Sequence, residues 1–166
     1  MATIDDLRFA LTLFAALGCG IIGGVFFAFS TFVMKALARL SPAEGIAAMQ
    51  TINIVVINPV FLGVFLGTAA ACAVVIISSF LRWQDSGSFY SLVGGLLYLV
   101  GTIMVTAVFN IPKNNSLAAV NPTAPESANL WADYLVNWTA WNHVRAAAAI
   151  AAAAALIISL CQKTTH

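Results

Sequence analysis

The sequence predicts an all-α membrane protein, a four-helix bundle whose spans run up-down-up-down. Of its 166 residues, 61% are hydrophobic and 8% are charged, and the mean hydropathy is +0.96. In a soluble domain roughly a quarter of the residues are charged, so this chain has too few charged residues to form a water-exposed surface. Charge-free runs extend over residues 9–34, 46–81, 86–112 and 146–162. Each run can cross about 30 Å of hydrocarbon as a helix, and none alternates like a barrel strand.

The first span is expected at about Phe9–Met34. Its length and its acidic N-terminal flank indicate a retained span and not a signal peptide. The span contains a GxxxG spacing at Gly20 and Gly24, and the second span repeats it at Gly63 and Gly67. Small residues at this spacing let neighbouring helix backbones approach closely. We expect these glycines to serve close packing within one bundle, with a dimer interface as the alternative.

A separate helix start lies between the first two spans. Ser41 is followed by Pro42 and, three residues after the serine, by Glu44, which together predict a capping box with proline in the first turn. We expect this helix to continue into the second span, about Val55–Leu81, with a kink at Asn58-Pro59.

The second half of the chain predicts two further spans. The short polar segment Arg82–Ser88 should join antiparallel neighbours, and the third span is expected at Phe89–Phe109. Asn110 is expected to end that span in the left-handed conformation and to open one long loop that extends to about Pro125. An amphipathic stretch from Glu126 then leads into the fourth span, Trp138–Cys161. The sequence shows no internal repeat, so residues 1–166 are expected to form a single domain.

Composition also excludes several functions. The net charge is +1 and no basic cluster is present, so we expect no nucleic-acid partner. The cysteines Cys19, Cys72 and Cys161 stand far apart in apolar runs and are expected to be packing thiols. Only His143 and His166 are available as imidazole ligands, and the spans lack carboxylates, so we expect no metal site. The missing carboxylates also weigh against an ion-driven transporter.

The strongest candidate site lies at the start of the fourth span. Steps of three and four residues place five side chains on one face of a helix: Trp131, Tyr134, Trp138, Asn142 and Arg145. An arginine beside a membrane span is costly unless it has partners or a function. We expect its guanidinium to face the amides of the other spans across a cavity.

The topology brings further polar residues to the same end of the bundle. The candidates are Gln50 and Asn53 before the second span, and Asn110 and Asn115 after the third. Sites in helix bundles lie between helices, with apolar walls and a few polar groups. Structural alternatives stay open for each candidate. Gln50 and Asn53 would tie helices together, Asn114 and Asn115 would form turns, the tryptophans would form an interfacial belt, His143 would be solvated, and Arg145 would reach the lipid headgroups.

Four segments together resemble the anthrone oxygenase family of small four-helix membrane proteins. They are residues 29–37 (FSTFVMKAL), 48–53 (AMQTIN), 110–117 (NIPKNNSL) and 138–145 (WTAWNHVR). The similarity follows nearly the whole chain in order. Lys35 stands where the family has proline, and Lys113 where leucine is usual. The substrate of this protein therefore need not be one of the family's named substrates.

The resemblance implies oxidation of an anthrone to an anthraquinone by O₂, with no metal, flavin or other cofactor. An anthrone tautomerises to an electron-rich enolate that can itself reduce O₂, so the protein need only remove a proton and hold the anion. Asn142 and Arg145 would then be catalytic donors, and His143 the candidate base. The aromatic face with Gln50, Asn53, Asn110 and Asn115 would bind the flat substrate.

We therefore expect an integral membrane protein, in a bacterial inner membrane, that acts on a hydrophobic aromatic or quinone-type molecule. A non-catalytic binder or accessory subunit for a lipid or hydrophobic metabolite is the alternative, and a small transporter is a third hypothesis. A homo-oligomer is left open.

Overall fold

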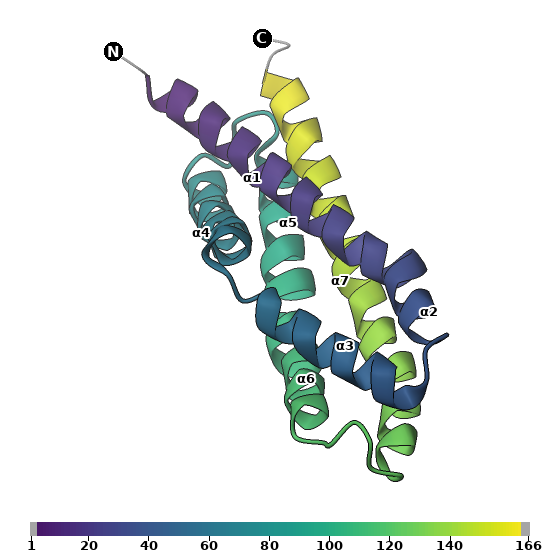
Figure 1. Ribbon diagram of the computed structural model, residues 1–166. Helices are drawn as coiled ribbons and strands as arrows, with labels where there is room; N and C mark the ends of the chain where they lie inside the picture. Colours follow the sequence, from purple (N-terminus) through teal and green to yellow (C-terminus); the bar gives the residue numbers. More distant parts are fainter. Residues whose placement is uncertain (1–2, 164–166) are drawn as a thin grey trace.

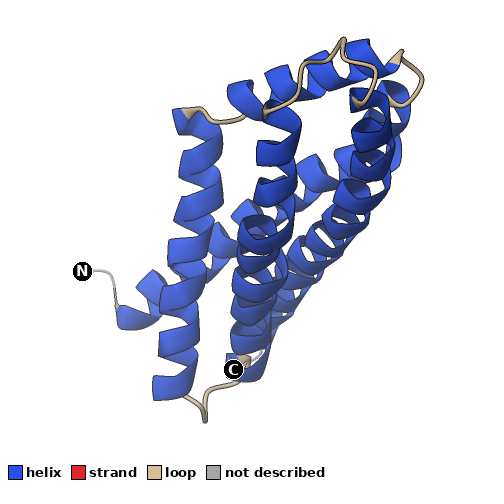
Figure 2. Cartoon of the chain, turned by 90° about the horizontal axis from the view of Figure 1, so that it is seen from below, coloured by secondary structure: helices blue, strands red, loops and turns tan. Residues whose placement is uncertain are grey.

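The computed structural model describes residues 3–163, and that part of the chain consists of helices and connections without a strand (Figures 1 and 2). Four helical stretches are long and apolar enough to cross a membrane: Ile4–Leu37, Pro59–Leu81, Ser88–Ala118 and Ser127–Gln162. The predicted all-α fold with four spans is confirmed. The predicted boundaries were too narrow at most ends, and His166 lies outside the described residues.

The spans form a closed ring of neighbours. Helix α1 (Ile4–Ala28) packs against α4 (Pro59–Leu81), α4 against α5 (Ser88–Tyr98), α5 against α7 (Ser127–Lys163), and α7 again against α1. The start of α1 and the end of α7 lie at the same end of the bundle as the α4–α5 connection (Figure 1). The candidate residues therefore gather at the opposite end.

The short α4–α5 connection depends on one glycine. Gly87 has φ +84°, and a Cβ built there would lie 2.7 Å from the carbonyl oxygen of Ser159 on α7. Only glycine accepts this left-handed conformation without a steric penalty. The tight turn makes α4 and α5 antiparallel neighbours, as the sequence predicts.

Small side chains bring α7 close to its neighbours. Ala149 and Ala152 are fully buried on α7. A Cβ at Gly23 of α1 would lie 3.0 Å from Ile150, and one at Gly94 of α5 would lie 2.7 Å from Leu156. Van der Waals packing replaces the hydrophobic effect as the attraction between helices in lipid, so these close approaches hold the bundle together.

The GxxxG glycines do not take part in this packing. A Cβ at Gly20, Gly24, Gly63 or Gly67 would have no heavy atom within 4 Å. The expectation of close packing within one bundle is therefore wrong for these four glycines. The rotation of α1 instead places Gly18 and Gly23 at the helix contacts, because they lie on the buried face with Cys19 and Ile22.

Helix α3 (Pro42–Val55) begins at the predicted capping box. The Glu44 backbone N–H donates to Ser41 Oγ at 3.4 Å, and the Ser41 backbone N–H donates to Glu44 Oε2 at 3.1 Å. The hydrogen bonds from Ser41 lower the pKa of the Glu44 carboxyl below its ordinary value. α3 does not run into the second span: it ends at Val55, and Asn58 starts α4 as a new N-cap that accepts from the Val60 and Phe61 N–H groups. The predicted kink is a break.

The third span continues well past Asn110. A π-helical stretch at Leu99–Met104 and another at Thr106–Asn110 lead into α6 (Ile111–Ala118). Asn110 has φ −84° and ψ −42°, so the predicted left-handed cap is wrong, and the connection to α7 is limited to residues 119–126. Pro112 lies in the first turn of α6, where its missing N–H is tolerated.

A third π-helical stretch, Phe29–Val33, joins α1 to the short helix α2 (Met34–Leu37). Such bulges are frequent at functional sites, because they turn side chains and leave carbonyl groups open to other donors. Two of these stretches carry residues that bond to the candidate residues: Ser30 accepts from Asn142, and Thr106 accepts from Arg145.

The cysteines divide into two environments. Cys19 and Cys72 are fully buried, with sulfur atoms 4.0 Å apart between α1 and α4, and the prediction of packing thiols is confirmed for them. Cys161 is exposed, so the prediction is wrong for that residue.

Candidate functional site

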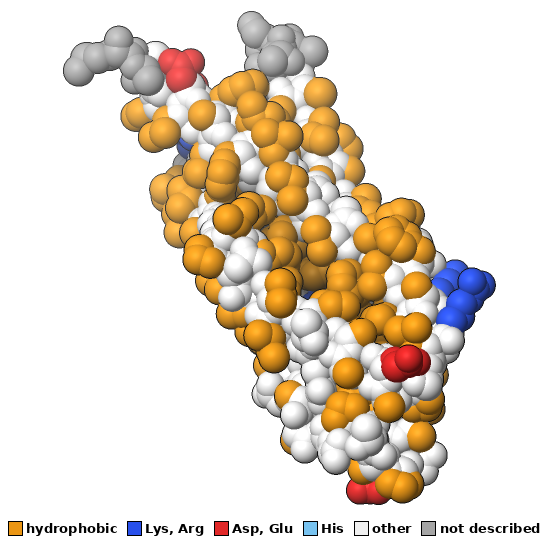
Figure 3. Space-filling view, in the orientation of Figure 1, with side chains coloured by type: hydrophobic (Ala, Val, Ile, Leu, Met, Phe, Trp, Pro, Cys, Tyr) orange, Lys and Arg blue, Asp and Glu red, His pale blue; other side chains and the backbone are white. Residues whose placement is uncertain are grey.

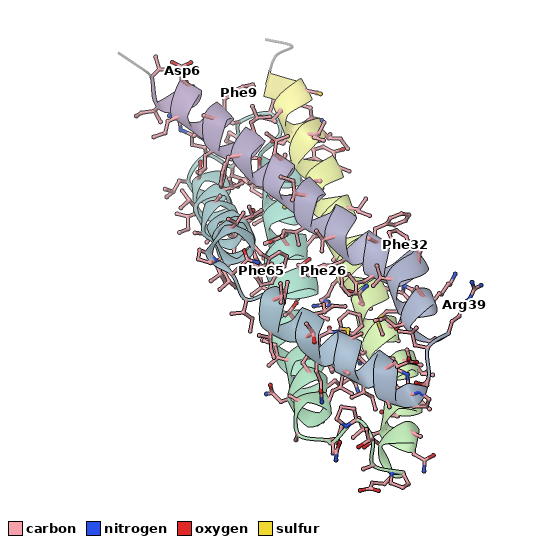
Figure 4. The ribbon with its side chains drawn as sticks, viewed as in Figure 1. Asp6, Phe9, Phe26, Phe32, Arg39 and Phe65 are labelled. Carbon is pink, nitrogen blue, oxygen red and sulfur yellow. The ribbon has the colours of Figure 1, made fainter. Side chains whose placement is uncertain are left out.

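A cavity of about 270 Å³ lies where α1, α3, α4 and α7 meet. Its wall is mostly apolar, and Phe26, Phe61 and Phe65 supply much of it. Phe26 and Phe65 lie next to each other between α1 and α4, with ring centroids 6.4 Å apart (Figure 4). On the face shared by α1, α3 and α4, hydrophobic side chains surround a hollow (Figure 3). The volume is near the lower end of the range for small-molecule pockets.

Arg145 is the charged residue of this wall. Its side chain comes from α7 and the residue is only 4% exposed. Nη1 donates to Thr106 Oγ1 at 3.2 Å, and Nη2 donates to Asn142 Oδ1 at 2.7 Å. The guanidinium carbon lies 4.1 Å from the ring centroid of Phe26 and 5.1 Å from that of Trp138. These contacts hold the cation in place without neutralising it.

No carboxylate neutralises Arg145 within the described part of the chain. The ion pairs found there join Arg8 and Arg82 to Asp5 and Asp85 at the opposite end of the bundle. In addition, the Nε of Arg145 makes no hydrogen bond. A buried cation without an anion is costly, so the site favours a ligand that brings negative charge.

Asn142 fixes the position of Arg145. It is fully buried, and its Nδ2 donates to the Phe26 carbonyl at 2.8 Å and to Ser30 Oγ at 2.7 Å. Ser30 belongs to the π-helical stretch that follows α1. Because both amide hydrogens are directed to the first span, the Oδ1 atom is turned toward the guanidinium.

Asn53 supplies a second unpaired donor. It reaches the cavity from α3, and its Nδ2 is buried without a hydrogen bond. The Tyr134 hydroxyl is close enough to interact with this amide. The hydroxyl and the amide do not meet the geometry of a hydrogen bond, and the hydroxyl donates to Asn114 instead. Nδ2 of Asn53 and Nε of Arg145 are thus both buried donors without a hydrogen-bond partner, on residues that line the cavity.

Asn114 is a cavity residue that the sequence interpretation placed in a turn. It lies on α6, and its Oδ1 accepts from the Tyr134 hydroxyl at 2.8 Å and from Trp138 Nε1 at 2.7 Å. Two donors on the oxygen leave Nδ2 as the group that can donate to a ligand. The sequence does contain a signal for this position. Asn110 and Asn114 are four residues apart, so they share one face if the helix continues past Asn110.

The aromatic face of α7 forms a stacked ladder. Ring centroids of Trp131 and Tyr134 are 5.7 Å apart, those of Tyr134 and Trp138 are 5.8 Å apart, and the planes are within 18° of parallel. Trp138 lines the cavity, whereas Trp131 packs over Gly45 of α3. Trp131 and Tyr134 therefore do not line the cavity. Tyr134 stacks on Trp138, which does, and Trp131 stacks on Tyr134.

Gln50 and Asn110, which the sequence also predicts for the site, do not line the cavity with Arg145. Gln50 donates through Nε2 to the carbonyl groups of Leu117 and Val120, at 2.9 and 3.1 Å, and so ties α3 to α6. Asn110 is fully buried and donates to the Trp138 carbonyl at 3.2 Å.

His143 and Asn115 lie outside the cavity. Asn115 is exposed on α6, at an outer hollow. His143 is exposed on α7 and does not line the cavity, because it follows Asn142 on the helix and is turned about 100° away. The structure therefore separates the predicted base from the predicted donors.

The fold and the cavity define a class: a small helical protein with four helices long and apolar enough to cross a membrane, and with a donor-rich, aromatic cavity between them. A profile of the family described as anthrone oxygenase matches residues 60–155, more than half of the chain. The chain therefore belongs to the anthrone oxygenase family. The matched part contains Asn114, Trp138, Asn142 and Arg145, whereas Asn53 lies outside it. No curated protein and no solved structure shows a significant match.

Proposed function

We propose that this protein is a membrane-embedded, cofactor-independent oxygenase that acts on a hydrophobic aromatic molecule of the anthrone or quinone type. The observation that carries the proposal is the buried Arg145 without a carboxylate partner, because its Nε and the Asn53 amide are both unpaired on residues that line one apolar cavity. Family membership supplies the reaction class.

The reaction balances without a further reductant. Conversion of the ring CH₂ group to a carbonyl removes four electrons, and O₂ takes up four electrons to give one carbonyl oxygen and one water. The first step is loss of a proton from the CH₂ group, which leaves an enolate with its charge on the existing oxygen. Hydrogen-bond donors placed at that oxygen stabilise the anion in a water-poor site.

The described cavity wall offers donors and no base. Arg145, Asn53 and Asn114 would donate to the enolate oxygen, and Trp138 with the phenylalanines would hold the flat rings. Because no carboxylate or imidazole among the described residues lines the cavity, the proton is expected to leave to water at the rim of the bundle. This role assignment replaces His143 as the expected base.

A purified preparation in lipid nanodiscs tests the proposal. An anthrone is incubated in air, and quinone absorbance and O₂ uptake are compared with empty nanodiscs. We expect a rate above autoxidation, incorporation of one ¹⁸O atom from ¹⁸O₂ into the new carbonyl, and loss of that rate in Arg145→Met. His143→Ala should retain the rate, and Asn129→Leu on the outer surface of α7 is the matched neutral control. A wild-type rate equal to autoxidation would refute the enzymatic function.

The missing base favours one second candidate, a non-catalytic binder of the same class of molecule. It predicts saturable binding of an anthraquinone that depends on Arg145, without any turnover of the anthrone. A bacterial inner membrane and a homo-oligomeric state stay predictions.

A further inference from the structure

A second hollow adjoins the cavity on its outer side. It has a volume of about 660 Å³ and lies between α3 and α6. Asn53, Ile57, Ile111 and Asn114 belong to the walls of both spaces. The two spaces therefore adjoin, with Asn53 and Asn114 at the boundary.

The chemistry of the wall changes along this path. The inner cavity is lined by phenylalanines, Trp138 and one cation, whereas the outer hollow has four amide side chains: Gln50, Asn53, Asn114 and Asn115. No ionisable residue lines the outer hollow in the described part of the chain. An amide both donates and accepts hydrogen bonds, so such a wall matches a group that does the same, such as a hydroxyl.

The outer hollow is held open by the protein itself. The two bonds from Gln50 Nε2 to the carbonyl groups of Leu117 and Val120 fix α3 against α6. The Asn114 amide is oriented by Tyr134 and Trp138. Asn115 is exposed, and its amide forms no hydrogen bond among the contacts described. Little reorganisation is then needed when a polar group enters.

We infer that the outer hollow is a subsite for a hydrogen-bonding, hydroxyl-type substituent of the flat polycyclic substrate. The inference rests on the proposed function, because the ring system must occupy the inner cavity. Asn115 is the specificity-determining residue: its amide meets the substituent and has no structural bond to lose. The substituent remains at the rim while the rings are buried.

Binding of two probes that lack the oxidisable ring CH₂ group tests the subsite without any turnover. The probes are 2-(hydroxymethyl)anthraquinone and 2-methylanthraquinone, measured by quenching of tryptophan fluorescence in nanodiscs, with empty nanodiscs to correct for partition into lipid. Asn115→Leu should weaken binding of the hydroxymethyl probe about fivefold, the contribution of about one hydrogen bond. It should leave the methyl probe within about twofold.

Two further variants separate the subsite from general damage. Ala118→Leu narrows the outer hollow without removing an amide, and should weaken the hydroxymethyl probe, which has the longer substituent, more than the methyl probe. Asn129→Leu makes the same change on an exposed surface of α7 and should alter neither probe.

The outcomes distinguish this inference from the function on which it rests. If both probes bind and Asn115→Leu treats them alike, the subsite is overturned and the proposed function stands. If neither probe binds the wild-type protein, the proposed function is overturned and the subsite with it.

Discussion

Replacement of Arg145 by methionine should weaken ligand binding strongly while it changes the stability of the protein only a little. The guanidinium makes two hydrogen bonds, each contributing about 1.5–3 kcal/mol when one partner is charged. It also makes two cation–π contacts, each contributing about 2 kcal/mol when desolvated. Against these stands the desolvation of a cation without a carboxylate partner, which still costs several kcal/mol in real proteins. The opposing contributions are of similar size, so we expect the free energy of unfolding to change by no more than about 2 kcal/mol.

Binding should respond much more strongly than stability. A ligand oxygen that accepts from the free Nε would lose a charge-assisted bond of up to about 3 kcal/mol, which is more than a hundredfold in Kd. Unfolding is followed by circular dichroism in increasing SDS, and binding of an anthraquinone by tryptophan fluorescence. Arg39→Met removes an exposed arginine and is the matched control.

Two results would refute this reasoning. The first is that Arg145→Met unfolds far more easily than the wild type while Arg145→Lys does not, which would make the cation a structural element. The second is that Arg145→Met binds the probe with an unchanged Kd, which would remove the guanidinium from the binding site.

Three further predictions concern the scaffold. Gly18→Ala should destabilise the bundle by about 1–3 kcal/mol in SDS unfolding, because its Cβ would lie 2.0 Å from Thr68 Oγ1. Gly20→Ala has no neighbouring atom and should be neutral or slightly stabilising. Equal effects of the two substitutions would contradict the helix packing. Asn142→Ala should weaken ligand binding at least tenfold, since the guanidinium loses its anchor, and should lower stability by about 2–3 kcal/mol; unchanged binding would argue against a positioning role. The lowered pKa of Glu44 means that its cap stabilises α3 above the ordinary carboxyl value of 4.5 and is lost as the pH falls through the lowered pKa; Glu44→Gln should remove that dependence, measured by hydrogen exchange of α3.

The sequence was informative wherever one helix determines the outcome. The steps of three and four residues from Trp131 to Arg145 placed these side chains on one face, and the structure buries all five. The capping box at Ser41 was also predictable, because its hydrogen bonds lie within four residues. The periodicity does not state which of these five faces a cavity, and only Trp138 and Arg145 line it.

The errors came from features that other parts of the chain decide. Asn110 resembles a helix end in sequence, but its amide donates to the Trp138 carbonyl on α7, which favours continuation of the helix. That continuation moves Asn114 from a turn into the cavity wall. The GxxxG glycines likewise match a packing motif, yet the rotation of α1 turns Gly20 and Gly24 outward.

By itself the sequence determined the number of spans, the helical class and the face that carries Arg145, because hydrophobicity and helical period are local properties of a chain in lipid. Only the tertiary structure decided which donors remain unpaired. Whether the Asn53 amide and the Arg145 Nε have partners depends on how α3 and α7 approach each other, and that approach is set by contacts between residues far apart in the chain.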